Sequence, residues 1–246
     1  MVHFVGAGPG AEDLITVRGM NLLAAADVII YAGSLVNPGL LTYAKPGCEI
    51  HNSAAMTLDE VINVIQRHRD KAIVRLHTGD PSLYGAIREQ MDRLIALDIA
   101  YAVCPGVSSF FGAAAALRAE YTLPDVSQTV IITRAAGKTP VPERESVRSL
   151  AAHGATMVFF LSAGLVDTIS RELIAGGYRP DTPAAVVYKA TWPDERIVRG
   201  TIATLPGMMD GITKTALVAV GDFLGDEYAL SRLYAPDFET EYRKAK

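Results

Sequence analysis

The chain has 246 residues, of which 50% are hydrophobic and 20% charged, with 21 Gly and 13 Pro. This composition excludes a disordered, collagen-like or low-complexity protein and is sufficient to bury a core in one large domain or two smaller ones. With 23 Lys and Arg against 27 Asp and Glu, the net charge of −4 provides no general field for attracting nucleic acid or an anionic membrane. An anionic ligand therefore needs a local basic patch.

The cysteines and the first residues of the chain indicate the cellular compartment in which the protein is expected. Cys48 and Cys104 lie far apart and outside any CxxC motif, which argues against a disulfide framework and favours a reducing environment. The start of the chain has no cationic leader, and apolar runs such as Met157–Leu161 are far shorter than the ~20 residues of a membrane helix. We expect a cytoplasmic protein with neither a membrane nor a nucleic-acid partner.

Short β-rich runs alternate with segments of helical period in the first half of the chain. Strands are predicted at Val2–Val5, Val28–Tyr31, Ile73–His77 and Tyr101–Val103. Helices are predicted at Asp13–Ala26, with Asp13 as a possible cap, and at Thr57–Arg69, Leu83–Leu97 and Ser108–Ala119. This βαβ alternation predicts a mostly parallel sheet.

The pattern changes near residue 121, which predicts two α/β domains, residues 1–120 and 121–246. Strands are expected at Thr129–Thr133, Met157–Leu161, Ala185–Lys189, Ile197–Arg199 and Ala216–Val220, with helices near Glu143–Ala152 and Leu165–Ala175. The Pro193-Asp194 turn separates two strand-like runs. A hairpin there makes the second sheet mixed.

Three Gly/Pro turns follow predicted strands of the first sheet. Ligands collect beyond the carboxyl ends of parallel strands, so these turns are the first places to look for a site. Gly6–Ala11 fits the relaxed dinucleotide pattern G-x-G-x-x-G/A, but Pro9 lacks an N–H donor and no acidic residue ends the second strand. A nicotinamide or flavin site is therefore disfavoured, and a simple tight turn stays possible.

The other two turns also admit structural interpretations. Asp80, in Thr78–Pro81, could contact a ligand, although its position before Pro81 favours a helix cap. Ser108 and Ser109 are better explained as helix caps than as nucleophiles.

Trp192 could form a wall of a ligand site or anchor the hairpin, and the sequence favours neither interpretation. The five histidines have no metal-binding spacing, so no metal is predicted.

Several motifs in one order carry a family resemblance. They are GAGPGAEDLIT, HTGDPSLYGA, CPGVSSF, TRAAGKTPVPE, FLSA and YKATWPDE, beginning at Gly6, His77, Cys104, Thr133, Phe160 and Tyr188. Together they resemble the tetrapyrrole methylases over nearly the whole chain. The TPVPE and KATWPDE segments are most similar to the branch that methylates C-11 of precorrin-4 in cobalamin biosynthesis.

The resemblance implies a homodimeric two-domain enzyme that binds S-adenosylmethionine between its domains and a tetrapyrrole acceptor. It implies cofactor contacts at Pro9, Gly79, Asp80, Tyr84, Ser108, Ser109, Thr133, Leu161, Ala190, Thr215 and Ala216. It assigns no catalytic residue and no metal. Whether the acceptor is metal-free or already carries cobalt stays open.

The acceptor of such an enzyme carries several carboxylates, so cationic side chains should hold it. Arg134 and Lys138 are the first candidates, because they follow the strand that opens the second domain, and Arg118 and Lys189 are weaker ones. Three other functions remain to be separated by experiment. They are a methylase acting on RNA or on a modified protein histidine, a nicotinamide-dependent oxidoreductase and a noncatalytic nucleotide-binding regulator.

Overall fold

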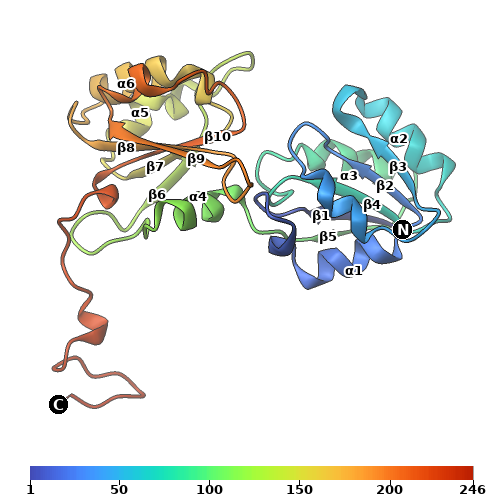
Figure 1. Cartoon of the computed structure of the whole chain (residues 1–246), viewed down its shortest axis with the longest axis horizontal. Helices are drawn as coiled ribbons and strands as arrows, with labels where there is room; N and C mark the ends of the chain where they lie inside the picture. The colour runs from blue at the N-terminus through green and yellow to red at the C-terminus, as the bar shows by residue number, and fades with distance from the viewer. Residues whose placement is uncertain (246) are drawn as a thin grey trace. The chain divides into compact units, whose positions relative to one another are not determined.

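A computed structural model describes residues 1–245, and the contacts within it define two compact units (Figure 1). The first unit is formed by Met1–Ala113 and Lys189–Glu195, and the second by Ala114–Tyr188 and the residues from Arg196 onward. The segment Lys189–Glu195 thus lies between two strands of the second unit in sequence but packs with the first. Each unit is an α/β structure with its own sheet.

The first sheet has five parallel strands in the order β3-β2-β4-β1-β5. They are β1 (Val2–Gly6), β2 (Val28–Tyr31), β3 (Glu49–Asn52), β4 (Ile73–His77) and β5 (Tyr101–Cys104). The predicted parallel sheet is confirmed. Strand β3 was not predicted, because it is a largely exposed edge strand with the mostly polar sequence Glu-Ile-His-Asn, which lacks an apolar face.

Four helices accompany the first half of the chain: α1 (Val17–Ala25), α2 (Leu58–Arg67), α3 (Ile87–Ala96) and α4 (Ser109–Leu117). The predicted start of the first helix at Asp13 is wrong, because Thr16 is the residue that caps α1, through a 3.1 Å hydrogen bond from Gly19 N–H. Asp13 lies in a separate 3-10 turn, Glu12–Leu14. The helix predicted from Leu83 begins only at Ile87, after a turn in which Tyr84 and Ala86 have positive φ.

Helices cover both faces of the first sheet (Figure 1). On one face, side chains such as Phe4 and Ile30 pack with Ile62 and Ile65 of α2 and with Leu94 of α3. On the other, Ile29 and Leu76 pack with Leu23 of α1 and with Leu40 of the 3-10 segment Pro38–Tyr43. Because helices bury both faces of this sheet, a ligand is expected to approach it at the ends of the strands.

The second sheet has the order β6-β7-β10-β8-β9 and is mixed, as predicted. Its strands are β6 (Val130–Thr133), β7 (Thr156–Phe159), β8 (Pro183–Tyr188), β9 (Arg196–Thr201) and β10 (Ala216–Val220). Only β6 and β7 are parallel, and β8 and β9 form the predicted antiparallel hairpin. Helices α5 (Val147–Ala151) and α6 (Val166–Ala175) pack together and cover one face (Figure 1).

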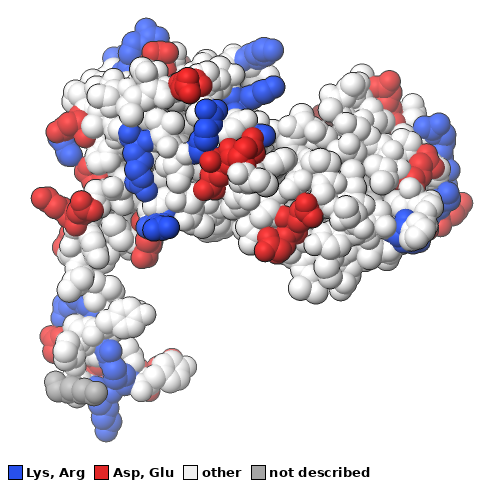
Figure 2. All heavy atoms as spheres, in the orientation of Figure 1, with Lys and Arg blue, Asp and Glu red and all other residues white. Residues whose placement is uncertain are grey.

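The helix predicted near Glu143–Ala152 is divided in two, because the Ser146 hydroxyl accepts the Ser149 N–H at 3.2 Å and starts α5 after a 3-10 turn, Glu143–Glu145. Basic and acidic side chains are interspersed over the face of each unit shown in Figure 2. None of the helices within residues 1–245 is long and apolar enough to cross a membrane.

Candidate active site

Three glycine turns meet at the carboxyl edge of the first sheet, after β1, β4 and β5. Gly8 and Gly79 exchange backbone hydrogen bonds of 3.3 and 2.9 Å. A methyl group on Gly106 would lie 2.2 Å from the carbonyl oxygen of Gly79 and 2.7 Å from Cα of Gly6. Only glycine permits this backbone packing. The predicted convergence of the three turns is confirmed.

Asp80 connects two of these turns. Its Oδ1 accepts the N–H of Ser82 at 2.8 Å, and its Oδ2 accepts the N–H of Gly106 at 2.8 Å. Partial burial opposes ionisation, but hydrogen bonds from the Ser82 hydroxyl and from the two backbone N–H groups outweigh it and hold the pKa of Asp80 below its usual value. The prediction that Asp80 caps the following helix is wrong, because α3 begins after Ala86. The carboxylate instead fixes the position of the Gly106 backbone.

The turn after β5 leads directly into α4. The Ser108 hydroxyl accepts the N–H of Phe110 at 3.3 Å, which confirms that Ser108 is a capping residue. Ser109 opens the helix, and Gly112 on its next turn faces Pro9, since a methyl group there would lie 2.7 Å from Pro9 Cβ. The buried Pro9 turn and the N-terminus of α4 therefore pack against each other.

The segment Lys189–Glu195 covers the turn after β1. A methyl group on Gly10 would lie 2.1 Å from the Trp192 indole, so this side chain anchors the segment on the glycine turn. The Thr191 hydroxyl accepts the N–H of Ala11 at 3.0 Å, and Lys189 pairs with Asp194 at 2.6 Å. The anchoring role considered for Trp192 is confirmed. The segment also brings the buried Ala190 to this turn.

Four of the predicted cofactor contacts lie at one edge of the second sheet: Thr133, Leu161, Thr215 and Ala216. Strand β10 runs antiparallel to β7, so its first residue lies at the edge where β7 ends. The loops after β6 and β7 are joined there, because Phe160 N–H donates to the Thr133 carbonyl at 2.8 Å and Ala135 N–H donates to the Ser162 hydroxyl at 2.8 Å. The second unit therefore has its own ordered strand-end loops.

Predicted site residues are enriched in strained backbone. Five of them have φ angles between +47° and +58°: Tyr84, Arg118, Leu161, Lys189 and Thr215. Side chains other than glycine avoid this region, at a cost on the order of 1–3 kcal/mol per residue. Such strain persists where surrounding contacts fix the backbone, and it is concentrated at binding sites. The strain at Leu161, Lys189 and Thr215, which adjoin strands, therefore supports a binding role for these loops.

The four predicted acceptor-binding cations have different surroundings. Arg134 donates to the carbonyls of Thr139 at 3.1 Å and Pro140 at 2.6 Å, so its guanidinium holds the loop that contains Lys138. Lys138 is exposed in that loop, and Arg118 is exposed just after α4. Arg118, Arg134 and Lys138 belong to the second unit, whereas Lys189 belongs to the first. All four remain predictions.

Sequence reasoning missed two polar residues of β4. Arg75 and His77 are 7% and 4% exposed and line a cavity of about 280 Å³ beside the turn after β4. Burial lowers the pKa of His77 to about 3, with a further contribution from the charge of Arg75. The available signal was the presence of Arg and His within the otherwise apolar run Ile-Val-Arg-Leu-His. Buried polar side chains in a strand usually have hydrogen-bond partners.

The sheet order, the glycine-lined strand ends and the two α/β units define a methylase-type α/β fold. The family profile described as Tetrapyrrole (Corrin/Porphyrin) Methylases matches residues 1–206, and the chain belongs to this family. The chain is therefore a methyltransferase enzyme.

Relatives match over nearly the full length. A cobalt-precorrin-4 C(11)-methyltransferase of Methanocaldococcus jannaschii is 54% identical, covering 99% of this chain and 96% of the relative. A precorrin-4 C(11)-methyltransferase of Mycobacterium tuberculosis is 46% identical over 95% of this chain and 96% of the relative.

Solved structures are also similar to this chain over most of its length. A cobalt precorrin-4 methyltransferase, described as a cobalamin biosynthetic enzyme, has a TM-score of 0.89 and 48% identity, covering 92% of this chain and 96% of that one. A uroporphyrin-III C-methyl transferase of Thermus thermophilus in complex with S-adenyl homocysteine has a TM-score of 0.76 and 25% identity, covering 91% of this chain and 93% of that one.

Proposed function

We propose that this chain transfers the methyl group of S-adenosylmethionine to C-11 of a precorrin-4 acceptor in cobalamin biosynthesis. The observation that carries the proposal is the 54% identity, over 99% of the chain, to a relative named for C-11 methylation. The stacked glycine turns and the strained residues beside them support it, because they form the closely packed, backbone-lined edge that such a donor requires.

The residues of the strand ends fit the proposed donor. When bound, S-adenosylmethionine supplies a methyl group on a positively charged sulfur that already carries its leaving group. The chain therefore has to orient, desolvate and align the reactants rather than provide a strong acid or base. The backbones at Gly6, Gly79 and Gly106 pack closely because no side chain separates them, and Asp80 fixes the position of Gly106.

Two forms of the acceptor are candidates. One relative named for cobalt-precorrin-4 is 54% identical and one named for precorrin-4 is 46% identical, so relatives of both kinds support the C-11 assignment. The test is turnover of each acceptor with a labelled methyl donor, followed by mass and NMR analysis of the product. Methylation at C-11 of either acceptor supports the proposal, and faster turnover of one identifies the form used.

Binding experiments separate the proposal from its rivals. S-adenosylhomocysteine should bind saturably, whereas NAD(H) should not, and the reverse result would identify an oxidoreductase. Binding without turnover of any tetrapyrrole would indicate a regulator, and methylation of RNA or of a modified protein histidine would indicate another branch of the fold.

Asp80→Ala is expected to weaken S-adenosylhomocysteine binding by about 1–3 kcal/mol, the scale of a lost hydrogen bond to a charged group. The reason is that the Gly106 N–H loses the acceptor that holds it at 2.8 Å. Asp80→Asn keeps an acceptor oxygen and should recover part of the affinity. Calorimetric titration measures both variants, and unchanged affinity in Asp80→Ala would show that Asp80 acts only within its own turn.

Arg134→Ala is expected mainly to raise the KM for the acceptor, by about tenfold, because a cation and the loop it holds are both lost. The affinity for S-adenosylhomocysteine should change little. Arg171→Ala, at an exposed arginine of α6, is the matched control. A weaker donor affinity with an unchanged acceptor KM would assign Arg134 to the donor instead.

We further propose that the enzyme is a homodimer and that the C-terminal segment contributes to the interface. This segment exposes Tyr228, Leu230, Tyr234 and Tyr242, at 55%, 81%, 80% and 91%. Arg243 organises it internally by donating to the carbonyls of Leu233 and Phe238. Exposed apolar side chains gathered on one segment are typical of interaction surfaces.

Removal of residues 226–246 is therefore expected to convert a dimer into a monomer, as measured by sedimentation equilibrium. Circular dichroism should show that both sheets remain folded, because every strand of the two sheets ends before residue 226. A truncated protein that stays dimeric would exclude this segment as the main interface, and a monomeric full-length chain would exclude the dimer itself.

A further inference from the structure

The cavity beside the turn after β4 contains two buried polar side chains that are not among the residues proposed to contact the methyl donor. Arg75 and His77 are two residues apart on β4, so both point to the face that carries α2 and α3. Both line the cavity of about 280 Å³, together with residues of the turn before α3 such as Tyr84 and Gly85. The cavity lies entirely within the first unit.

In the part of the chain that the structure describes, His77 has a buried ring nitrogen without a partner, and Arg75 is only partly satisfied by neighbouring groups. Arg75 Nε donates to Gln90 at 3.1 Å and Nη1 donates to the Ile30 carbonyl at 3.2 Å. Within residues 1–245 no carboxylate pairs with Arg75, and its Nη2 donates to no protein group. The Nε2 atom of His77 is buried with no hydrogen-bond partner in that same part of the chain. A buried ring nitrogen such as His77 Nε2 is costly to leave unsatisfied.

We propose that this cavity binds one carboxylate side chain of the tetrapyrrole acceptor. A carboxylate has two oxygens, of which one can accept from Arg75 Nη2 and the other from His77 in the tautomer with a proton on Nε2. The only acidic residue lining the cavity is Glu89, and it is exposed. The inference rests on the proposed function for the identity of the ligand. That the bound group is a carboxylate follows from the cavity alone.

The first test uses propionate as the probe, so that it does not depend on turnover. In protein with ¹⁵N-labelled histidine, propionate should shift the His77 ring resonance saturably, with a dissociation constant on the order of millimolar. Propionamide, which has the same shape without the charge, should not. An absent or non-saturating propionate shift would mean that the cavity holds only water, and this would overturn the proposal.

The second test follows the acceptor. His77→Leu should raise the acceptor KM about tenfold to hundredfold and leave S-adenosylhomocysteine affinity unchanged, whereas His77→Gln, which keeps an N–H donor, should recover part of the loss. His153→Leu, at an exposed histidine, is the matched control. An unchanged KM in His77→Leu overturns the proposal. A saturable propionate shift in a chain that methylates no tetrapyrrole would instead leave the carboxylate site standing and reject the proposed function.

A second, independent observation concerns three side chains at the edge of the first sheet, Glu49, His51 and His68. Glu49 and His51 lie two apart on β3, and His68 follows the last turn of α2. The two imidazole Nε2 atoms contact different oxygens of Glu49, at 2.7 Å for His51 and 3.3 Å for His68. One potential ligand atom from each residue lies within 4.8 Å of the others.

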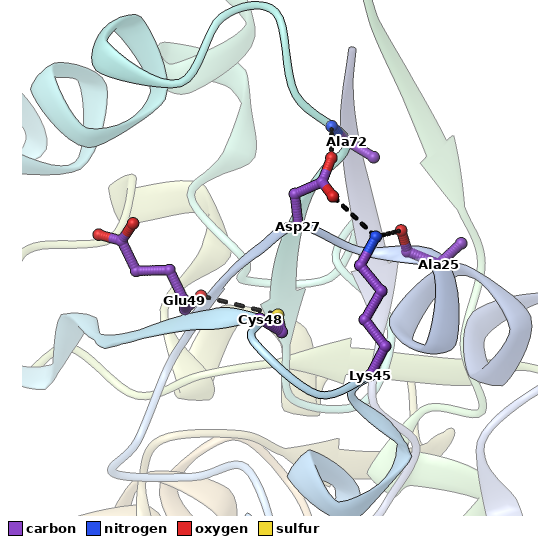
Figure 3. A network of polar contacts seen from close by, with 6 residues as sticks. All are labelled: Ala25, Asp27, Lys45, Cys48, Glu49 and Ala72. Atoms are coloured by element: carbon purple, nitrogen blue, oxygen red, sulfur yellow. Dashed lines mark hydrogen bonds and ion pairs between the residues drawn. The ribbon is translucent and has the colours of Figure 1, made fainter.

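The nearby lysine does not compete with a metal ion for the Glu49 carboxylate. The nearby Lys45 pairs with Asp27 at 2.7 Å, and Figure 3 shows the Glu49 side chain pointing away from both. The side chains of Glu49, His51 and His68 are 46%, 24% and 16% exposed, so an ion and its water ligands can reach them. Two imidazoles and one carboxylate with open positions are a ligand set for zinc and related ions.

We propose that Glu49, His51 and His68 bind one divalent transition-metal ion and thereby tie the edge strand β3 to the end of α2. Tetrahedral zinc requires ligand atoms about 3.3 Å apart, which the present contacts approach. The site lies away from the glycine turns and needs no part in methyl transfer. The sequence did not suggest it, because 17 positions and a whole helix separate His51 from His68.

Equilibrium dialysis with Zn²⁺ should show one bound ion per chain, and the thermal midpoint should rise with Zn²⁺. His51→Ala or His68→Ala should weaken binding at least about tenfold and abolish the thermal shift, whereas His153→Ala should do neither. Co²⁺ binding in wild type and in Cys48→Ser tests whether the neighbouring thiol is the real ligand. Loss of binding only in Cys48→Ser, or stoichiometric binding that survives both histidine changes, would overturn the proposal.

Discussion

Gly106→Ala is expected to destabilise the first unit by about 3 kcal/mol or more and to abolish S-adenosylhomocysteine binding. The added methyl group would lie 2.2 Å from the Gly79 carbonyl oxygen and 2.7 Å from Cα of Gly6. Both neighbours are buried backbone atoms, one in the turn after β4 and one at the end of β1, so they cannot rotate away as a flexible side chain does. The turns must separate, and with them the surface proposed for the donor.

Urea unfolding and a calorimetric titration of the same preparation measure the two effects. Gly207→Ala is the matched control, because a methyl group there meets no atom within 4 Å and its backbone is not in the left-handed region. That change should alter stability by no more than about 1 kcal/mol. Equal stability of the two variants would show that the turns yield easily and that their close packing does not depend on glycine.

The features that the sequence predicted correctly are local ones. Apolar runs such as Ile73–His77 and Ala216–Val220, bounded by Gly, Pro or polar residues, are strands in the structure. In the first half of the chain such runs alternate with helices. A helix that connects two strands of one sheet lets them run parallel, so the parallel first sheet was predictable. The glycine turns at the ends of such strands were also recognisable, because glycine indicates a turn in the local sequence.

The features that were missed depend on contacts distant in sequence. Strand β3 has no apolar face of its own and exists because it pairs with β2 at the sheet edge. Asp80 looked like a helix cap, because the preference of Asp before Pro is local, whereas the contact that defines its role is with Gly106, 26 residues away. The packing of Trp192 against Gly10 spans most of the chain and had no local signal that distinguished it from a ligand wall.

The candidate site also contains both features that the local sequence predicts and features that depend on contacts distant in sequence. Its backbone-lined turns were found from glycine and proline, whereas the buried pair Arg75 and His77 was passed over as part of a strand. The sequence shows that these residues are polar, but only the fold shows that no carboxylate in residues 1–245 forms an ion pair with Arg75. Burial and the missing partner together make the residues informative.

His77 is also expected to make the protein sensitive to mild acid. Its folded pKa of about 3 lies below the ordinary value of 6.5, because burial and the charge of Arg75 disfavour the imidazolium. Between these values the unfolded chain binds a proton that the folded chain does not. Stability is therefore full above pH 6.5 and falls as the pH is lowered towards 3, by at most about 1.4 kcal/mol per pH unit.

His77→Gln removes this titration, and its urea-unfolding free energy should fall less steeply than that of wild type between pH 6.5 and 4.5. The range is chosen because Asp27 and Asp80, whose folded pKa values are also lowered, lose their contributions only at lower pH. Charged groups near His77 are Arg75 and the exposed Glu89 across the cavity. Parallel pH profiles for the two proteins would mean that the imidazole accepts a proton in place, and that water or an ion entering the cavity satisfies it.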